Sequence, residues 1–445
     1  MRIKHILLPL FAAFMAVSCD SFLDVEPVGK AIPKTYSEYR ALITDAYNSQ
    51  LVDRSYSAFL SDEAQFVPSD DSYIPFYKDI YIWNVVSPDA STIETPWQKF
   101  YKVIFYANHI IKNKADITEG TTDEVNQLVG EAYLLRAYMY FNLVNLYADH
   151  YNPATAATMR GVPISDLDND LEKRNKPSSV EAVYSKVLAD IESGTALLNV
   201  SEQPKGYNYR FSKVSAYGFA ARAYLYMGSY AKAQEFAQKA LAINSKLEDL
   251  NSASAVMPYS YKSVENIFAL EQTYTLDNSS TLAVSASLVA AYDKANDLRF
   301  NALYRSSGSR YKVKMNGRND NKVSLRTAEL YLIKAEAIAQ GGGNLDDAKS
   351  TLKELLKSRL KPSYYSQRAL AIDAMDKDGF VQEVFAERNR ELAFQGFRWF
   401  DLKRNGKPSI TKTYDGETFV LQQNDPRYIV RFPKEAVVNN PYLAD

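Results

Sequence analysis

Two pairs of helix-periodic segments, each joined by a glycine turn, constrain the fold more than any other feature of this chain. The first pair spans residues 212–227 and 230–243 and is joined at Gly228. The second pair spans residues 323–340 and 345–359 and is joined by a run of three glycines. Apolar residues recur every three or four positions in each segment, which is typical of helices that bury one face. A helix–turn–helix unit that returns within one chain predicts stacked helical hairpins.

Small residues in these hairpins predict close packing between paired helices. The repeated positions are Tyr224, Ala233, Ala237 and Ala240 in the first hairpin and Ala348, Leu352 and Leu355 in the second. This spacing resembles a degenerate tetratricopeptide unit, in which Ala237 replaces the usual Phe and the second turn is longer. We therefore predict a mainly α fold, a tetratricopeptide-like helical-hairpin scaffold with irregular loops and a few short strands.

The same reasoning predicts the remaining elements. We expect helices that begin near Thr35 and after Pro177, where Ser178 or Ser179 would cap the first turn, and helices over 97–113 and 124–147. Residues 67–96 and 251–322 are rich in turn-forming residues and predict irregular structure. Short strands are expected at 267–270, 418–421 and 428–432. We divide the folded chain into an N-terminal helical part, 35–250, and a C-terminal part, 251–445, packed as one unit.

The first 34 residues indicate export and a lipid anchor. A basic start precedes an apolar stretch over 6–17, which is shorter than the roughly 20 residues of a membrane-spanning helix and is typical of a signal peptide. The stretch leads into Cys19 and resembles a bacterial lipobox, with Ala16 where Leu is commoner. We predict a signal peptide at 1–18, lipid attachment at Cys19 and a tether over 19–34. The alternative is a plain secretory signal.

The charge balance excludes a partner recognised by charge alone. The chain has 52 Lys and Arg against 53 Asp and Glu, a formal net charge of −1 at pH 7. A basic field for nucleic acid or for an anionic membrane surface is therefore absent from the sequence. By contrast, 33 Tyr outnumber 21 Phe and 3 Trp. The flat ring and polar tip of Tyr suit both helix packing and stacking on sugar rings.

An aromatic segment within 67–96 is the first candidate ligand-binding region. Its candidate contacts are Asp71, Tyr73, Tyr77, Tyr81 and Trp83. Rings in a polar, irregular segment are harder to explain as core residues, and loops on a rigid scaffold frequently carry function. The alternative is that these rings pack the loop onto the helices. A second candidate region, 272–321, offers Tyr292 and Arg318, with Tyr274, Tyr304 and Asn319 nearby.

Catalytic motifs are not evident. Neither a nucleophile elbow, a phosphate-binding loop nor a paired metal-ligand motif appears. His109 falls in a predicted helix, where packing or capping is the simpler interpretation. Asp70 and Asp71 are neighbours in one loop and are poorly placed to flank a glycosidic bond. The alternating charges over 387–391 predict structural ion pairs, because buried charges are almost always paired. We predict no catalytic residue, no cofactor and no metal site.

Six segments occur in order behind the lipobox. They are 97–111, 130–147, 161–164 (GVPI), 325–337 (LRTAELYLIKAEA), 387–404 (ERNRELAFQGFRWFDLKR) and 432–441. Together with the start at Cys19, they resemble the SusD/RagB-type nutrient-uptake lipoproteins of the Bacteroidetes outer membrane. Two positions depart from the family pattern: Gln395 replaces the usual Glu, and Ala148-Asp149 replace a glycine and an aromatic residue.

The resemblance implies a non-catalytic, cell-surface lipoprotein of the outer membrane that captures a nutrient, expected to be an oligo- or polysaccharide. It also implies a lid on a SusC-like TonB-dependent barrel transporter. Ligand would drive closure because it binds the closed state better than the open one. The alternatives are a surface glycoside hydrolase, a tetratricopeptide-like scaffold for protein partners, and capture of a peptide.

Overall fold

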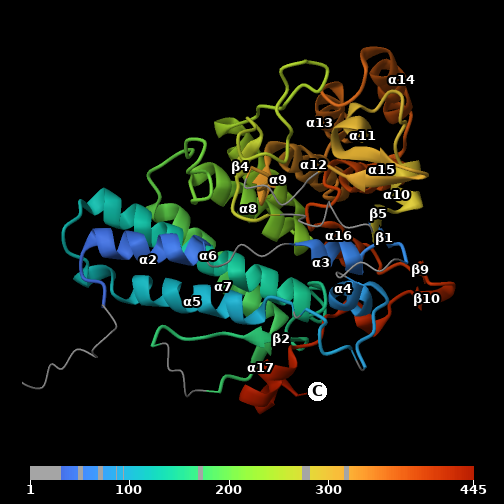
Figure 1. Ribbon diagram of the computed structural model, residues 1–445. Helices are drawn as coiled ribbons and strands as arrows, with labels where there is room; N and C mark the ends of the chain where they lie inside the picture. Colours follow the sequence, from blue (N-terminus) through green and yellow to red (C-terminus); the bar gives the residue numbers. More distant parts are fainter. Residues whose placement is uncertain are drawn as a thin grey trace, which may run out of the picture.

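Stacked helices form most of the computed structural model of the chain (Figure 1). The structure describes residues 32–48, 54–68, 74–86, 88–93, 95–168, 174–272, 281–314 and 320–444. The α-helices are α2 (Tyr36–Asn48), α3 (Ser55–Leu60), α4 (Ile74–Tyr81), α5 (Trp97–Lys112), α6 (Thr122–Tyr147), α7 (Val180–Leu197), α8 (Lys213–Tyr226), α9 (Tyr230–Ile243), α10 (Ala286–Ala290), α11 (Leu298–Leu303), α12 (Thr327–Gln340), α13 (Leu345–Lys357), α14 (Pro362–Asp373), α15 (Lys377–Glu391), α16 (Arg398–Arg404) and α17 (Lys434–Asn439). The predicted mainly α fold is confirmed.

Strands are short and pair two by two among the described residues. They are β1 (Ala64–Phe66), β2 (Arg160–Pro163), β3 (Pro177–Ser179), β4 (Asn266–Phe268), β5 (Leu282–Val284), β6 (Tyr304–Ser307), β7 (Arg310–Val313), β8 (Leu325–Arg326), β9 (Ile410–Tyr414) and β10 (Glu417–Leu421). Single 3-10 turns form η1 (Lys114–Asp116), η2 (Pro426–Tyr428) and η3 (Pro441–Leu443). The antiparallel pairs β1–β5 and β4–β8 tie together loops that are distant in sequence.

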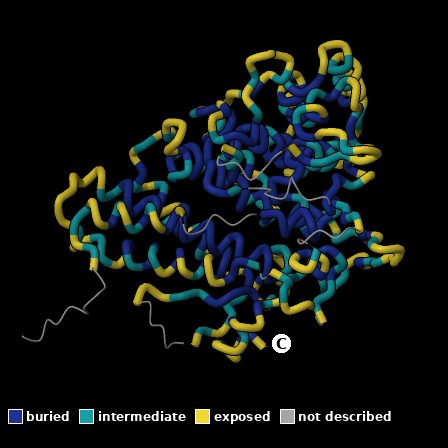
Figure 2. The backbone as a smooth tube through the Cα atoms, viewed as in Figure 1, coloured by how far each residue is buried: buried dark blue, intermediate teal, exposed yellow. Residues whose placement is uncertain are grey.

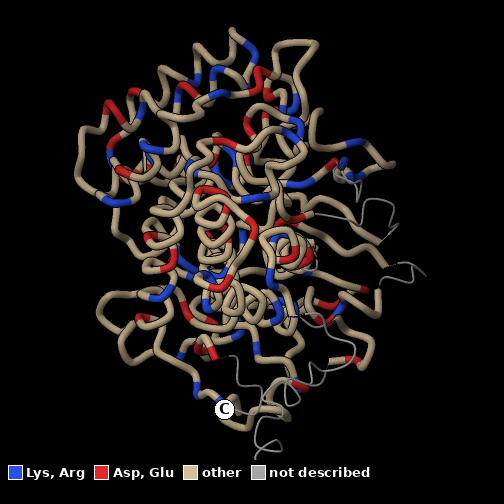
Figure 3. The backbone as a smooth tube through the Cα atoms, turned by 90° about the vertical axis from the view of Figure 1, so that its left-hand side faces the viewer, with Lys and Arg blue, Asp and Glu red and all other residues tan. Residues whose placement is uncertain are grey.

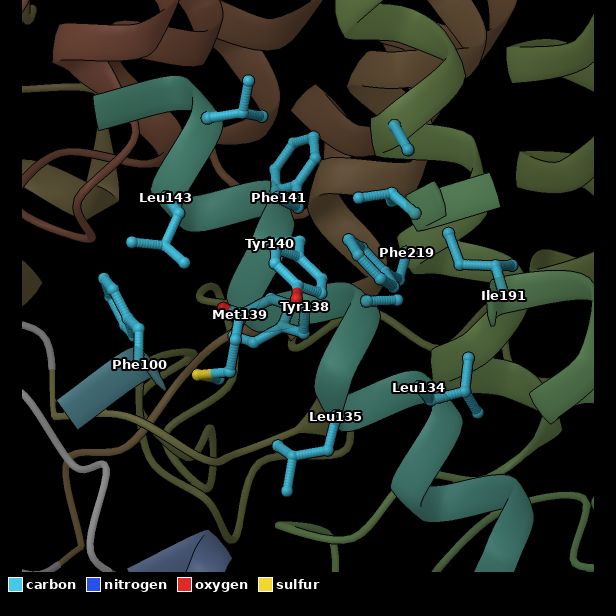
Figure 4. Close-up of a cluster of buried hydrophobic side chains, with 14 of the residues drawn as sticks. Phe100, Leu134, Leu135, Tyr138, Met139, Tyr140, Phe141, Leu143, Ile191 and Phe219 are labelled. Atoms are coloured by element: carbon cyan, nitrogen blue, oxygen red, sulfur yellow. The ribbon is translucent and has the colours of Figure 1, made fainter. Parts of the chain in front are cut away.

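Helix α6 is the central helix of the largest apolar core. From 127 to 147 every residue except Tyr133 is buried. Its side chains contact Phe100 of α5, Ile191 of α7 and Phe219 of α8 (Figure 4). Thr121 and Glu124 cap the start of α6 reciprocally, because each side chain accepts a hydrogen bond from the other residue's backbone N–H. Figure 2 shows the buried backbone running through the centre, with exposed turns at the edges.

Helices α6 and α7 approach unusually closely at two glycines. A Cβ atom added to Gly130 would lie 2.8 Å from the carbonyl oxygen of Gly194. A Cβ atom added to Gly194 would lie 2.8 Å from the carbonyl oxygen of Gly130. Both positions therefore require the absence of a side chain. The serine cap predicted for α7 is confirmed at Ser179, which accepts a hydrogen bond from the N–H of Ala182 at 3.1 Å.

The two predicted hairpins are confirmed as α8–α9 and α12–α13, and α9 packs against α12 so that the hairpins stack. The repeated alanines and leucines are fully buried, as the spacing predicts. Gly228 takes a φ of 70° at the first turn, a conformation that favours glycine. The apolar core around α6 includes Ile267 and Trp399, and thus crosses residue 250. The division of the chain at residue 250 stays a prediction.

Two local predictions are wrong. Residues 74–81 form α4 instead of a loop, because Pro75 in the first turn needs no backbone donor and Tyr77 and Tyr81 fall on one buried face. The strand expected at 428–432 is a turn, η2, followed by extended chain without a strand in this described segment. Tyr428 is held there by stacking on Trp399 at 4.6 Å. The strand predicted at 418–421 is confirmed within β10, and that at 267–270 overlaps β4.

Candidate functional site

The predicted ligand-binding rings that the structure describes are buried. Tyr77, Tyr81, Trp83 and Tyr292 are at most 9% exposed. Tyr77 packs 4.7 Å from the ring of Phe59, and the hydroxyl of Tyr292 donates to a backbone carbonyl at 2.6 Å. Tyr304 is buried beside Tyr292. These are packing contacts of core residues, so a role in ligand binding stays a prediction for them. Asp71, Tyr73, Tyr274, Arg318, Asn319 and Cys19 lie outside the described residues.

Lys412 of β9 joins the ends of two helices beneath Trp83. Its buried ammonium donates to the carbonyls of Phe59 and Leu60 at the end of α3 and to that of Tyr81 at the end of α4. These carbonyls lack partners within their own helices. The ammonium also lies 4.1 Å from the Trp83 ring centroid. Burial lowers the pKa of Lys412 well below its usual value, against the opposing effect of Asp62.

Above Trp83, an apolar groove of about 960 Å³ separates the segment after α4 from the C-terminal segment. Its apolar lining comprises Leu60, Ile80, Trp83, Val85, Val86, Pro88, Ala90, Ile93, Val430, Phe432, Pro433, Val437, Val438, Leu443 and Ala444. Asp79 fixes the first wall, because its carboxylate accepts from the N–H of Asp89 at 2.5 Å and from the hydroxyl of Thr92 at 3.0 Å. The second wall carries Arg431 and Lys434.

A second, more polar pocket of about 400 Å³ lies where the end of α2 meets four loops. Its lining residues are Tyr47, Asn48, Gly206, Asn208, Tyr209, Tyr261, Ala269, Leu270, Asp320 and Lys322. Tyr209 and Tyr261 are partly exposed, whereas the ring of Tyr47 is fully buried and packs edge-on to that of Tyr209 at 5.5 Å. We call this the tyrosine pocket. Its two partly exposed rings were not among the predicted ligand contacts, although Asp320 lies within the second predicted region, 272–321.

Hydrogen bonds make the tyrosine pocket a defined surface. The amide of Asn208 donates to the carbonyls of Tyr261 at 2.9 Å and of Asn266 at 3.0 Å. The backbone N–H of Tyr261 donates to the carbonyl of Asp320, which joins two walls. At the rim, Lys262 pairs with the Asp320 carboxylate at 3.1 Å, and both side chains are about half exposed. The arrangement offers a hydroxyl-rich ligand two partly exposed tyrosine rings, each with a neighbouring cation over one face, and one carboxylate.

The charges of α15 form ion pairs, as predicted. Arg390 pairs with Glu387 at 2.7 Å within the helix. Glu391 accepts from Arg326 at 2.5 Å and from Arg359 at 3.0 Å, although neither partner was foreseen. Burial alone would raise the pKa of Glu391, but the surrounding guanidinium groups outweigh it and hold that pKa well below its usual value.

Gln395 completes this buried cluster with a group that both donates and accepts. Its amide oxygen accepts from Nε of Arg326 at 3.0 Å, and its amide nitrogen donates to the carbonyl of Glu391 at 3.2 Å. A glutamate could make only the first of these bonds at neutral pH. The other departure, Asp149, pairs with Lys407 at 2.5 Å. Both departures are therefore accommodated by local partners.

The described residues offer little support for a metal site, a membrane-spanning helix or a catalytic histidine. Over those residues, acidic, histidine and cysteine side chains do not gather in threes at a site that could hold a metal ion. None of the described helices combines the length and apolarity needed to cross a bilayer. His109 stacks on Tyr39 at 5.8 Å, a packing contact. Figure 3 shows acidic and basic residues interleaved over the molecule, without a face of one sign.

Two family models match the chain. One, described as starch-binding and associating with the outer membrane, matches residues 21–225, and the model of the SusD family matches residues 300–441. The chain belongs to the SusD/RagB family. The predicted family is thus confirmed over both halves of the chain.

Relatives of this SusD/RagB-family chain agree with the models. SusD-like protein P38 of Formosa agariphila is 24% identical, over 88% of this chain and 88% of the relative. A SusD superfamily structure from Bacteroides thetaiotaomicron has a TM-score of 0.77 at 20% identity, over 92% of this chain and 98% of the other. A laminarin-binding SusD-like protein has a TM-score of 0.66 at 18% identity, over 92% and 98%. At these identities the two structures show the fold.

Proposed function

We propose that this protein is a non-catalytic surface lipoprotein that binds a glycan in the tyrosine pocket and acts as a lid for a TonB-dependent barrel transporter of the outer membrane. The observation that carries the proposal is the convergence of Tyr209, Tyr261 and Asp320 in one pocket. Its volume of about 400 Å³ is within the range of small-ligand sites. The starch-binding description of the family and the laminarin-binding relative support a glycan ligand.

The tyrosine pocket is suited to binding and not to hydrolysis. A glycosidase typically needs two carboxyl groups that flank the scissile bond, about 5–10 Å apart. Among the described residues that line the pocket, Asp320 is the only carboxylate, and Lys262 already pairs with it. Neither a histidine nor a cysteine lines the pocket in the described part of the chain. This composition argues against the alternative of a surface glycoside hydrolase.

Binding to a glycan panel that includes starch and laminarin tests the pocket. Tyr261→Ala and Asp320→Ala should each weaken binding at least about fivefold, because a ring–sugar contact or a charge-assisted hydrogen bond contributes about 1–3 kcal/mol. Tyr442→Ala is the matched control, since Tyr442 is 51% exposed and lies outside the pocket. Unchanged affinity in both pocket variants would disprove the site, and release of reducing sugar would disprove the non-catalytic role. Asp71, Tyr73 and Arg318 stay proposed contacts and can be tested in the same assay.

The anchor and the lid are tested separately from the pocket. Cys19→Ala should release the protein from the membrane fraction and reduce glycan uptake, while the purified variant binds glycan with unchanged affinity. Co-purification of an outer-membrane barrel with the lipidated wild type, in mild detergent, supports the lid. Retention of the Cys19→Ala variant in the membrane would contradict the lipid anchor.

A further inference from the structure

We infer that the apolar groove above Trp83 is a docking site for an extended segment of a partner protein that carries aliphatic side chains and a carboxylate. The groove shares no lining residue with the tyrosine pocket among the described residues. The inference goes beyond the proposed glycan binding and does not depend on it.

Exposed aliphatic side chains converge on this groove from both of its walls. Val86 is 82% exposed and Ile93 is 37% exposed on the first wall, and Val438 is 78% exposed on the second. Single exposed apolar residues are common on protein surfaces and need no explanation. Three that line one hollow, above partly buried Val85 and Val430, form a contiguous apolar surface of the kind that marks an interaction site.

The second wall of the groove is positively charged. Arg431 and Lys434 are exposed, and neither forms a salt bridge within the described residues. The guanidinium of Arg431 donates to the carbonyl of Val85 at 3.2 Å, which holds it at the groove. The acidic residues Asp79 and Asp89 lie on the first wall, where neutral donors of their own loop hold them in place. Asp79 accepts from Asn84, Asp89 and Thr92. Asp89 accepts from both the N–H and the hydroxyl of Ser91. A partner carboxylate that lies along the second wall would therefore meet two cations that form no salt bridge within the described residues.

The lining favours a protein segment over a sugar. Glycan sites present open aromatic faces, but the two rings that line this groove are occupied elsewhere. Trp83 is 3% exposed, and its indole N–H donates to the carbonyl of Leu60 at 3.0 Å. Phe432 packs on Trp97 at 5.1 Å and on Tyr147 at 5.5 Å. What the groove does offer is aliphatic surface beside a positive edge, which complements an extended chain with apolar and acidic side chains.

Photo-crosslinking in the bacterium that produces the protein tests the docking site. A benzophenone amino acid is placed at Val86 of the full-length chain, and the matched control position is Leu370 on α14, which is 73% exposed and outside the groove. We expect one protein adduct at Val86 that is absent at Leu370. Mass spectrometry should place the crosslink in a partner segment that contains aliphatic residues and at least one Asp or Glu.

Charge reversal then tests the electrostatic part of the inference. Arg431→Glu combined with Lys434→Glu should reduce the Val86 adduct at least fivefold, while glycan affinity and the melting temperature stay within error. The inference is overturned by the absence of an adduct, by an adduct with lipid, glycan or residues 1–31 of the same chain, or by an adduct that charge reversal leaves unchanged. Loss of glycan affinity without loss of the adduct would instead count against the proposed pocket.

Discussion

Two regions of the core are held together by different forces. Around α6, apolar side chains from α5, α7 and α8 surround the helix, and the pair Arg136–Asp190 is a buried exception. Around Glu391, by contrast, buried salt bridges join residues from four other parts of the chain. Glu391 and Glu265 both accept from Arg326 and Arg359, and Arg299 contacts Glu391 from α11 at 2.8 Å.

The difference teaches which kind of change each region tolerates. Apolar burial is proportional to area and has little directionality, so the α6 region should accept substitutions that preserve volume. Buried ion pairs add little net stability when complete, but the loss of one partner leaves an uncompensated charge in a low-dielectric site. The Glu391 cluster should therefore be intolerant of changes that preserve shape and alter charge.

The largest expected effect comes from Glu391→Gln, which keeps the shape and removes the charge. Three buried guanidinium groups would lose their shared carboxylate, and the free energy of unfolding should fall by about 3–5 kcal/mol. Urea denaturation followed by circular dichroism measures the change. The control is Asp168→Asn, which breaks an exposed pair with Lys112 and should cost less than about 1 kcal/mol. Equal effects of the two variants would remove the distinction between the regions.

A substitution in the α6 region tests the other side of the comparison. Leu135→Ala should destabilise the protein by about 2–5 kcal/mol, because it leaves a cavity among fully buried neighbours. Leu135→Met conserves the volume and should cost less than about 1.5 kcal/mol. The same denaturation assay measures both. If the methionine variant loses as much unfolding free energy as the alanine variant, the α6 region depends on exact side-chain shape and is no more tolerant than the Glu391 cluster.

Glu63 extends the comparison to pH, because this buried carboxylate forms no salt bridge within the described residues. Burial raises its pKa from 4.5 to about 7, although the N–H of Phe394 donates to it and acts in the opposite direction. The folded chain therefore keeps a proton that the unfolded chain loses. This contribution is complete below pH 4.5 and is lost as pH rises through 7.

Glu63→Gln, which mimics the protonated form, should remove that loss. Relative to the wild type, the variant should gain about 3 kcal/mol in unfolding free energy between pH 4.5 and pH 8. Denaturation curves at a series of pH values measure the difference. The Leu135 variants provide the contrast, since their differences from the wild type should not change with pH. A pH-independent difference for Glu63→Gln would show that the carboxylate is already ionised in the folded protein.

Local signals made much of the helical scaffold predictable from sequence. Apolar spacing, glycine turns and the serine cap at Ser179 act within a few residues of one another, so α5, α6 and both hairpins were located within a few positions of their ends. Residues 74–81 were misassigned because Pro75 and the neighbouring polar residues resemble a loop, whereas burial of Tyr77 and Tyr81 depends on Phe59 and Phe66. Helix formation there is set by tertiary contact.

The candidate site was less predictable, for the same physical reason. The tyrosine pocket combines Tyr47, Tyr209, Tyr261 and Asp320, which come from four separate segments and carry no shared local pattern. Likewise, the alternating charges over 387–391 predicted ion pairs but did not identify the partners. Arg299 and Arg326 are 92 and 65 residues away from Glu391. Pairs over such separations are set by the tertiary fold and cannot be recognised from the local spacing of residues in the sequence.

The position of Lys412 has a consequence for the order in which the chain can be completed during synthesis. The carbonyl of Phe59 at the end of α3 finds its partner 353 residues later, in Lys412 on β9. When a ribosome has made only the first four hundred residues, the Leu60 carbonyl already has the Trp83 indole as a partner, but the carbonyls of Phe59 and Tyr81 still lack Lys412. The N-terminal part must wait, with those carbonyls in water, until almost the last tenth of the chain emerges. Completion of its native contacts is thus a late event that a truncated chain cannot reach.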